Sequence, residues 1–323
     1  MYRIATLQGT YLAVYPAGVC EFWKTGPRRT ERENCRFCSV GLNLGADDDP
    51  EKTVDEVLEV VHAAVDESGI TYVDFNTGHY DHGDFLAVVE PYARRVKQET
   101  GLLVGVQTPP LQGAEGYERL RSIGVNRVSF CFEIFDRETF RRVCPGKHRV
   151  YGLDGYLSAV EQAVAAGRRG RRSQPWVVNG ELIAGLEPPA RSVEAIHWLT
   201  ARGAIPTVCV FRPLVGTNLA EQPPPRTEDL VPVFQALWSS CMERGLPIGV
   251  APNIHVSLVL LPDEARWLVQ DEATLRRLAG RERRRRLLQG AFATRWYAGR
   301  ALRGRRTRSR AARARVPISS PDL

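Results

Sequence analysis

The chain has 323 residues, 43% hydrophobic and 25% charged, a composition that is typical of globular proteins and excludes a fibrous or wholly disordered one. No apolar run reaches the roughly 18 residues that a membrane span needs, and residues 1–8 lack the pattern of a secretory signal, so we expect a cytoplasmic protein without membrane segments. The net charge of +7 is uneven, because residues 276–323 carry +14 and residues 1–275 carry −7.

Short apolar runs alternate with helical patterns over most of the chain. The runs predict strands at 11–15, 70–76, 102–107, 127–133, 176–184 and 205–211, with last strands at 247–250 and 255–260. Helices are predicted between them at 53–69, where Thr53 is the N-cap and Gly69 the stop, and at 85–99, 116–123, 153–166, 192–202 and 227–244.

This alternation of strand and helix predicts parallel strands buried beneath helices. Six or seven such units favour an α/β fold of the TIM-type (β/α) barrel, full or partial, over an open doubly wound sheet. The active site is then expected at the carboxyl ends of the strands.

The pattern changes near residue 262, which predicts a barrel domain at 1–262 and a C-terminal part at 263–323. Residues 263–278 are compatible with one helix, and 280–315 are nearly all Arg, Ala and Leu. Such a basic extension, partly disordered, either docks nucleic acid or an acidic surface, or is simply a solvated tail.

Seven cysteines in a chain without a secretion signal favour metal or redox chemistry over disulfides. Cys20, Cys35 and Cys38 follow the first strand with the spacing C-x14-C-x2-C. Three thiolates suit a 4Fe–4S cluster with one open iron, whereas structural zinc needs a fourth ligand. The segment contains no fourth ligand, and the nearest alternatives are His79 and His82.

A three-cysteine loop after strand one, with Phe37 before its last cysteine, resembles the radical S-adenosylmethionine (radical SAM) superfamily. The usual spacing there is C-x3-C-x2-C, so the long first gap makes Cys20 the unusual member. The resemblance implies that an open iron binds S-adenosylmethionine and that one-electron reduction releases a 5′-deoxyadenosyl radical. It also implies a reductase or a flavodoxin- or ferredoxin-type electron donor.

Further segments resemble the cofactor-binding parts of this superfamily, nearest to the branch of biotin synthase, the hydrogenase-maturation proteins and the tyrosine lyases. The residues concerned are Thr77 and Gly78 for the methionyl amine, Glu133 for the ribose hydroxyls, Arg142 for the carboxylate, and Ile183 and Gly185 for the adenine. The alternative role of Glu133 is that of a strand-end carboxylate paired with an Arg. Strand alternation puts Cys131 on the same face as Glu133.

Polar residues at strand ends are candidates for substrate chemistry. His79, His82 and Arg212 are predicted catalytic residues, and Asn253 and His255 are weaker candidates of the same kind. Cys131 and Cys209 either hold a second cluster or are buried as small hydrophobes.

We therefore expect a radical SAM enzyme that abstracts hydrogen from a small metabolite or cofactor precursor. One alternative is the same chemistry on an RNA or peptide docked by the Arg-rich tail. The other is a zinc-stabilised nucleic-acid-binding protein without radical chemistry.

Overall fold

The computed structural model describes residues 3–16, 18–27, 30–81, 84–111, 113–169, 175–247, 260 and 262–314. The predicted strands 247–250 and 255–260 lie outside the described residues except at Pro247 and Leu260, which are not in strands. His82, Asn253 and His255 also lie outside them.

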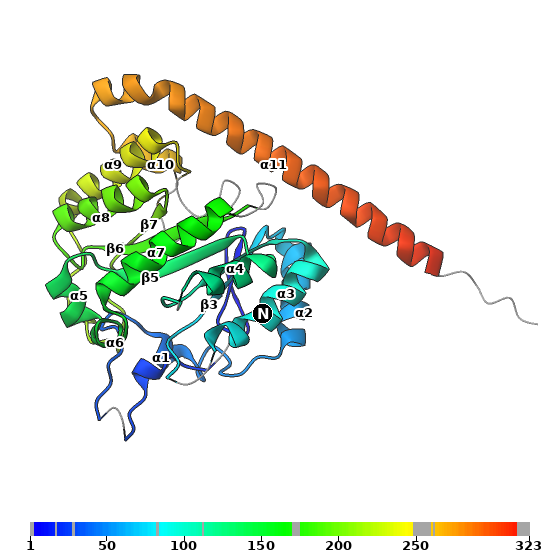
Figure 1. Ribbon diagram of the computed structural model, residues 1–323, viewed down its shortest axis with the longest axis horizontal. Coiled ribbons are helices and arrows are strands. Elements are labelled where there is room, and N and C mark those ends of the chain that lie inside the picture. The colour runs from blue at the N-terminus through cyan, green and yellow to red at the C-terminus, as the bar shows by residue number, and fades with distance from the viewer. Residues whose placement is uncertain are drawn as a thin grey trace, which may run out of the picture.

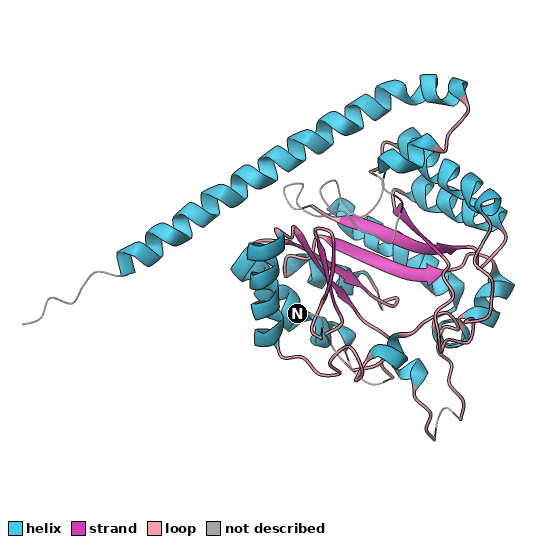
Figure 2. Ribbon diagram, turned by 180° about the vertical axis from the view of Figure 1, so that it is seen from behind, coloured by secondary structure: helices cyan, strands magenta, loops and turns pink. Residues whose placement is uncertain are grey.

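A seven-stranded sheet forms the centre of the protein, and Figure 2 shows it between the surrounding helices. The strands follow one another in the sheet in chain order. They are β1 Thr6–Gln8, β2 Tyr11–Val14, β3 Tyr72–Asn76, β4 Leu103–Gln107, β5 Arg127–Glu133, β6 Val177–Ala184 and β7 Ile205–Val210. β1 pairs antiparallel with β2, and every later pair is parallel. The sheet curls with β1 and β7 as the edges of its described part, so the predicted α/β barrel is confirmed in its partial form.

Helices follow the strands and cover the outer face of the sheet (Figure 1). The main ones are α2 Val54–Ser68, α3 Phe85–Thr100, α4 Ala114–Ser122, α7 Gly152–Arg169, α8 Pro189–Arg202 and α9 Thr227–Arg244. α2 shows why the local sequence predicts them. Thr53 and Glu56 form a reciprocal capping box at its start, and Gly69 ends it with a left-handed φ of 62°.

Shorter helices occupy stretches that the sequence analysis treats as loops. They are η1 Glu21–Trp23, α1 Val40–Asn43, α5 Arg137–Val143 and α6 Pro145–Val150. Each has two turns or fewer, which is too short for a helical period to be visible in the sequence.

The Arg-rich C-terminal part forms one long helix, α11 Glu272–Ala314, which projects beyond the rest of the protein (Figure 1). One helix is expected at 263–278, but the structure has two helices there. The first, α10 Pro262–Trp267, is short, and α11 begins at Glu272 and runs without a break to Ala314. Arg and Ala favour helix, which explains the continuity. Phe292 packs against a cluster formed by the first residues of three strands, Tyr11, Tyr72 and Leu103. α11 therefore crosses the amino-terminal ends of these strands.

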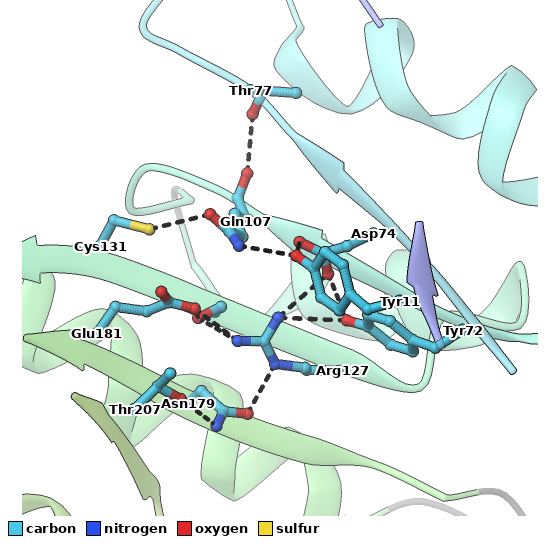
Figure 3. A network of polar contacts seen from close by, with 11 residues as sticks. Tyr11, Tyr72, Asp74, Thr77, Gln107, Arg127, Cys131, Asn179, Glu181 and Thr207 are labelled. Carbon is cyan, nitrogen blue, oxygen red and sulfur yellow. Dashed lines mark hydrogen bonds and ion pairs between the residues drawn. The ribbon is translucent and has the colours of Figure 1, made fainter. Parts of the chain in front are cut away.

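A buried polar network closes the interior of the curled sheet above that end (Figure 3). Arg127, whose side chain is 3% exposed, donates to Asp74 over 3.1 Å, to Glu181 over 2.5 Å and to Asn179 over 2.9 Å. The Tyr11 hydroxyl donates to Asp74 over 2.7 Å. Buried charges are tolerated when they are paired and hydrogen-bonded in this way. The space left inside the sheet consequently lies toward the carboxyl ends of the strands.

Candidate active site

A cavity of about 280 Å³ opens at the carboxyl ends of the strands, between the cysteine loop and the inner face of the sheet. Several residues that the sequence analysis selects line this one cavity: Cys20, Cys35, Cys38, Thr77, Gly78, His79, Cys131 and Glu133. The barrel prediction placed the active site at this end of the strands, and the cavity lies there.

The cysteine loop is held by backbone hydrogen bonds to three distant segments. The Glu21 N–H donates to the His79 carbonyl over 2.8 Å, which fixes the part next to Cys20. The Arg36 N–H donates to the Val143 carbonyl over 2.9 Å, and the Arg36 carbonyl accepts from Leu219 over 3.2 Å. The turn from Cys35 to Cys38 is thus fixed between the end of α5 and the segment after β7.

Gly78 lets the cysteine loop approach the end of β3. A Cβ atom on residue 78 would lie 2.4 Å from the Cys20 Cβ and 2.7 Å from its backbone Cα. Real Cβ atoms do not approach other heavy atoms this closely, so glycine is required here for the Cys20 thiol to reach the cavity.

Each of the three thiols accepts a hydrogen bond. The backbone N–H of His79 donates to the Cys20 sulfur over 3.3 Å, and that of Val40 donates to the Cys38 sulfur over 3.5 Å. The third donor is the Cys144 thiol, which is fully buried next to Val143 and bonds the Cys35 sulfur. Sequence reasoning left Cys144 unassigned, because its contact with Cys35 depends on the packing of α5 and α6 on the loop.

These contacts make the three thiols unequal. The hydrogen bond from Cys144 lowers the pKa of Cys35, and the Lys147 ammonium lowers it further against the effect of burial. Burial raises the pKa of Cys20, and it raises the pKa of Cys38 to about 12. Of the three thiols, Cys35 is therefore the one that most readily loses its proton to give a thiolate, the form that metal ions bind.

The residues present fit an iron–sulfur cluster. Three thiols from one loop line a single cavity, and each has the hydrogen-bond donor that thiolate ligands in such clusters accept. Among the described residues, no three His, Cys, Asp or Glu side chains surround one point closely enough to hold a single metal ion.

Glu133 and Lys147 form a largely buried ion pair beside the thiols, with side chains 13% and 15% exposed. Glu133 ends β5 at a shift in the strand register. Its φ of 68° is positive, and among the described residues it is the one non-glycine residue with a positive φ. Such strain is typical of functional positions. The Lys147 Nζ lies 3.3 Å from the Glu133 Oε1 and also donates to the Cys131 carbonyl. The partner of Glu133 is thus a lysine of α6, where the alternative reading expected an arginine.

The pKa values of this pair reflect burial and mutual attraction. Burial raises the pKa of Glu133, and Lys147 only partly offsets this. Burial lowers the pKa of Lys147, but the neighbouring Cys35 and Glu133 outweigh it and hold this pKa well above its ordinary value. The cavity therefore contains a permanent cation beside the thiols, which the sequence analysis did not single out.

The His79 ring is engaged on both sides. Its Nδ1 lies 2.6 Å from the Tyr151 hydroxyl and its Nε2 lies 2.8 Å from the Asp81 Oδ1. The ring also stacks on Phe22, with 4.3 Å between centroids. These contacts fix the segment whose backbone N–H bonds the Cys20 sulfur.

Other sequence-predicted residues lie outside the cavity lining. Arg142 and Arg212 are exposed. The Arg142 carbonyl accepts from the Arg36 side chain over 2.7 Å. Ile183 and Gly185 lie at the end of β6, and Cys209 lies on β7. Their roles, and a second cluster held by Cys131 and Cys209, stay predictions.

A curled parallel sheet with a three-thiol loop at its carboxyl edge defines a partial-barrel enzyme of the iron–sulfur class. The family model described as the radical SAM superfamily matches residues 31–222, and the chain belongs to that superfamily. The matched range includes Cys35 and Cys38 and begins after Cys20. Members of the superfamily are enzymes that use an iron–sulfur cluster and S-adenosylmethionine.

Individual relatives agree with this assignment over parts of the chain. The bacteriochlorophyllide c C-7(1)-hydroxylase of Chlorobaculum limnaeum is 29% identical over 114 residues, which are 35% of this chain and 27% of that protein. The chain thus spans about a quarter of the length of this curated relative.

Two solved structures share the fold. The FeFe-hydrogenase maturase HydG from Carboxydothermus hydrogenoformans has a TM-score of 0.56 at 17% identity, over 74% of this chain and 52% of that chain. Methylornithine synthase has a TM-score of 0.51 at 17% identity, over 83% of this chain and 80% of that chain.

Among the helices of the described residues, none combines the length and the apolar character that a membrane span requires.

Proposed function

We propose that this protein is a radical SAM enzyme whose 4Fe–4S cluster is held by Cys20, Cys35 and Cys38. The observation that carries the proposal is that these three thiols line one cavity together with the Glu133–Lys147 pair. Three thiolates leave one iron open for S-adenosylmethionine. When bound, such a cluster would supply the electron that cleaves S-adenosylmethionine into methionine and a 5′-deoxyadenosyl radical, and this radical would abstract hydrogen from the substrate.

The chain's own residues would bind and orient the cofactor. Thr77 and Gly78 are at the end of β3 beside Cys20, where the methionyl amine is expected. Glu133 would accept hydrogen bonds from the ribose hydroxyls. Lys147, rather than the exposed Arg142, is the cation within the cavity and would pair with the methionyl carboxylate.

The size of the site supports a small substrate. A cavity of about 280 Å³ inside a curled sheet suits a small metabolite or cofactor precursor better than an RNA or a peptide. The electron is proposed to come from a reductase or a flavodoxin- or ferredoxin-type protein. Docking of nucleic acid by α11 stays a prediction, supported by fifteen Arg and two Glu in that helix.

Anaerobic reconstitution tests the proposed function. We expect about four irons and four sulfides per chain, as a 4Fe–4S cluster requires. Adding S-adenosylmethionine should change the electron paramagnetic resonance spectrum of the reduced cluster, because the cofactor binds the open iron. Cluster-loaded protein whose spectrum does not respond to S-adenosylmethionine would contradict the proposal, and zinc in place of iron would support the nucleic-acid-binding alternative.

Replacing Glu133 with glutamine should weaken S-adenosylmethionine binding by roughly ten- to a hundredfold, since one charge-assisted hydrogen bond contributes about 1.5–3 kcal/mol. Iron content should stay unchanged, because the thiols lie in another loop. Isothermal titration calorimetry on the cluster-loaded protein measures the affinity for S-adenosylmethionine. The control is Glu138→Gln on the exposed side of α5, where only an ion pair with Arg141 is lost. A destabilised Glu133→Gln protein with normal affinity would remove Glu133 from the cofactor site.

A further inference from the structure

Glu181 lies on β6 at the deep end of the cavity, opposite Cys131 in the register with β5. Its side chain is 13% exposed, and it lines the cavity. The thiols lie in the loop at the carboxyl ends of the strands, whereas Glu181 lies within its strand, beside the buried polar network (Figure 3). It is therefore a candidate for contact with a substrate that lies deeper than the cofactor.

The polar network holds this carboxylate in one orientation. Arg127 directs Nη2 to the Glu181 Oε1 over 2.5 Å, and the Ser129 hydroxyl donates to the same oxygen. The remaining nitrogens of Arg127 are used by Asn179, Asp74 and the Tyr72 hydroxyl. Arg127 thus has no donor group left for a ligand, and its role is to fix Glu181.

The second carboxylate of the network is already satisfied. The Asp74 Oδ1 accepts from Arg127 over 3.1 Å and from the Tyr72 hydroxyl, and its Oδ2 accepts from the Tyr11 hydroxyl over 2.7 Å. One guanidinium therefore faces two carboxylates, and the network retains one negative charge. Of the two carboxylates, Glu181 is the one that reaches the cavity.

The other oxygen of Glu181, Oε2, has no hydrogen-bond partner among the described residues, and Figure 3 draws no bond to it. The neighbouring polar groups are occupied with each other. The Cys131 thiol donates to the Gln107 Oε1 over 3.3 Å, and the Gln107 Nε2 donates to the Tyr11 hydroxyl over 3.3 Å. The Glu181 Oε2 is open to the cavity and not enclosed by protein atoms, so it can accept a hydrogen bond from a bound ligand.

We infer that Glu181 Oε2 binds a cationic hydrogen-bond donor of the substrate, a protonated amine, at the deep end of the cavity. This inference rests on the proposed function for the identity of the site. Lys147, the cation of the cavity lining, donates to Glu133 and to the Cys131 carbonyl, and no ion pair joins it to Glu181 among the described residues. An ammonium group supplies both the missing donor and the missing positive charge, whereas a carboxylate in its place would be repelled.

The inference is tested with three small aromatic probes that differ in charge. They are the cation benzylammonium, the neutral benzyl alcohol and the anion benzoate. Their affinities are measured by ligand-detected NMR on the full chain, with and without cluster and S-adenosylmethionine. We expect benzylammonium to bind most tightly. In Glu181→Gln it should bind roughly ten- to a hundredfold more weakly, the loss expected for one charge-assisted hydrogen bond. The affinity for benzyl alcohol should change little.

Benzoate binding as tightly as benzylammonium, or an unchanged benzylammonium affinity in Glu181→Gln, would overturn the inference. If Glu181→Gln does not fold, the ranking of the three probes on the wild-type chain still decides. The control Glu138→Gln, an exposed carboxylate outside the cavity lining, should keep its benzylammonium affinity. Normal iron content and S-adenosylmethionine affinity in Glu181→Gln, together with unchanged probe binding, would refute the amine site and leave the proposed function intact.

Discussion

Cys35→Ala protein is expected to hold almost no iron after reconstitution, whereas the wild type is expected to hold about four irons per chain, those of the proposed cluster. Cys35 is the thiol with the lowered pKa, and it lies at the fixed turn between α5 and the segment after β7. Removing it leaves two thiols, which do not retain a cluster against loss to solvent. Cys38→Ala is expected to behave in the same way. Iron and sulfide analysis and the absorbance of the cluster measure the result.

The control is Cys241→Ala, because Cys241 is buried in α9 and does not line the cavity. This variant should load normally. Cys20→Ala is the sharpest member of the series, since the family match begins after Cys20 and its spacing to Cys35 is unusual. Full loading of Cys20→Ala would place the third ligand elsewhere, and Cys144, in contact with Cys35, is then the nearest thiol to replace next.

Arg127→Met is expected to lower the free energy of unfolding by about 3–5 kcal/mol, the usual cost of removing one partner from a buried ion pair. Methionine has a similar length but no charge, so Asp74 and Glu181 are left without their shared cation. Urea unfolding followed by circular dichroism measures the loss. Arg191→Met is the matched control, because its ion pair with Glu194 is exposed and contributes about 0–1 kcal/mol.

The triple variant Arg127→Met, Asp74→Asn, Glu181→Gln separates charge from packing. Neutralising both carboxylates should recover part of the stability, because the uncompensated charges are then gone. An Arg127→Met protein as stable as the Arg191→Met control would contradict a structural role for the network. If the triple variant loses as much stability as Arg127→Met, then Arg127 stabilises the protein by packing and not by its charge.

The sequence by itself determined the fold class and the metal ligands to test. The alternation of apolar runs with helical periods depends on neighbouring residues alone, and β3, β5 and α2 begin or end within two residues of their predicted bounds. Thr53 and Gly69 cap α2 as predicted, because capping is a local hydrogen-bond requirement. The Cys35–Cys38 spacing is also local, and it pointed to cluster chemistry in the superfamily to which the chain belongs.

Only the tertiary structure decided which distant side chains meet. Arg127 and Glu181 are 54 residues apart, and Tyr11 and Asp74 are 63 apart. Lys147 lies in a helix of six residues that has no visible period, and it reaches the cavity because α6 packs against the cysteine loop. Residues so far apart in the sequence are brought together by the pairing of parallel strands and by the packing of helices on them. A single sequence has no local signal for these contacts.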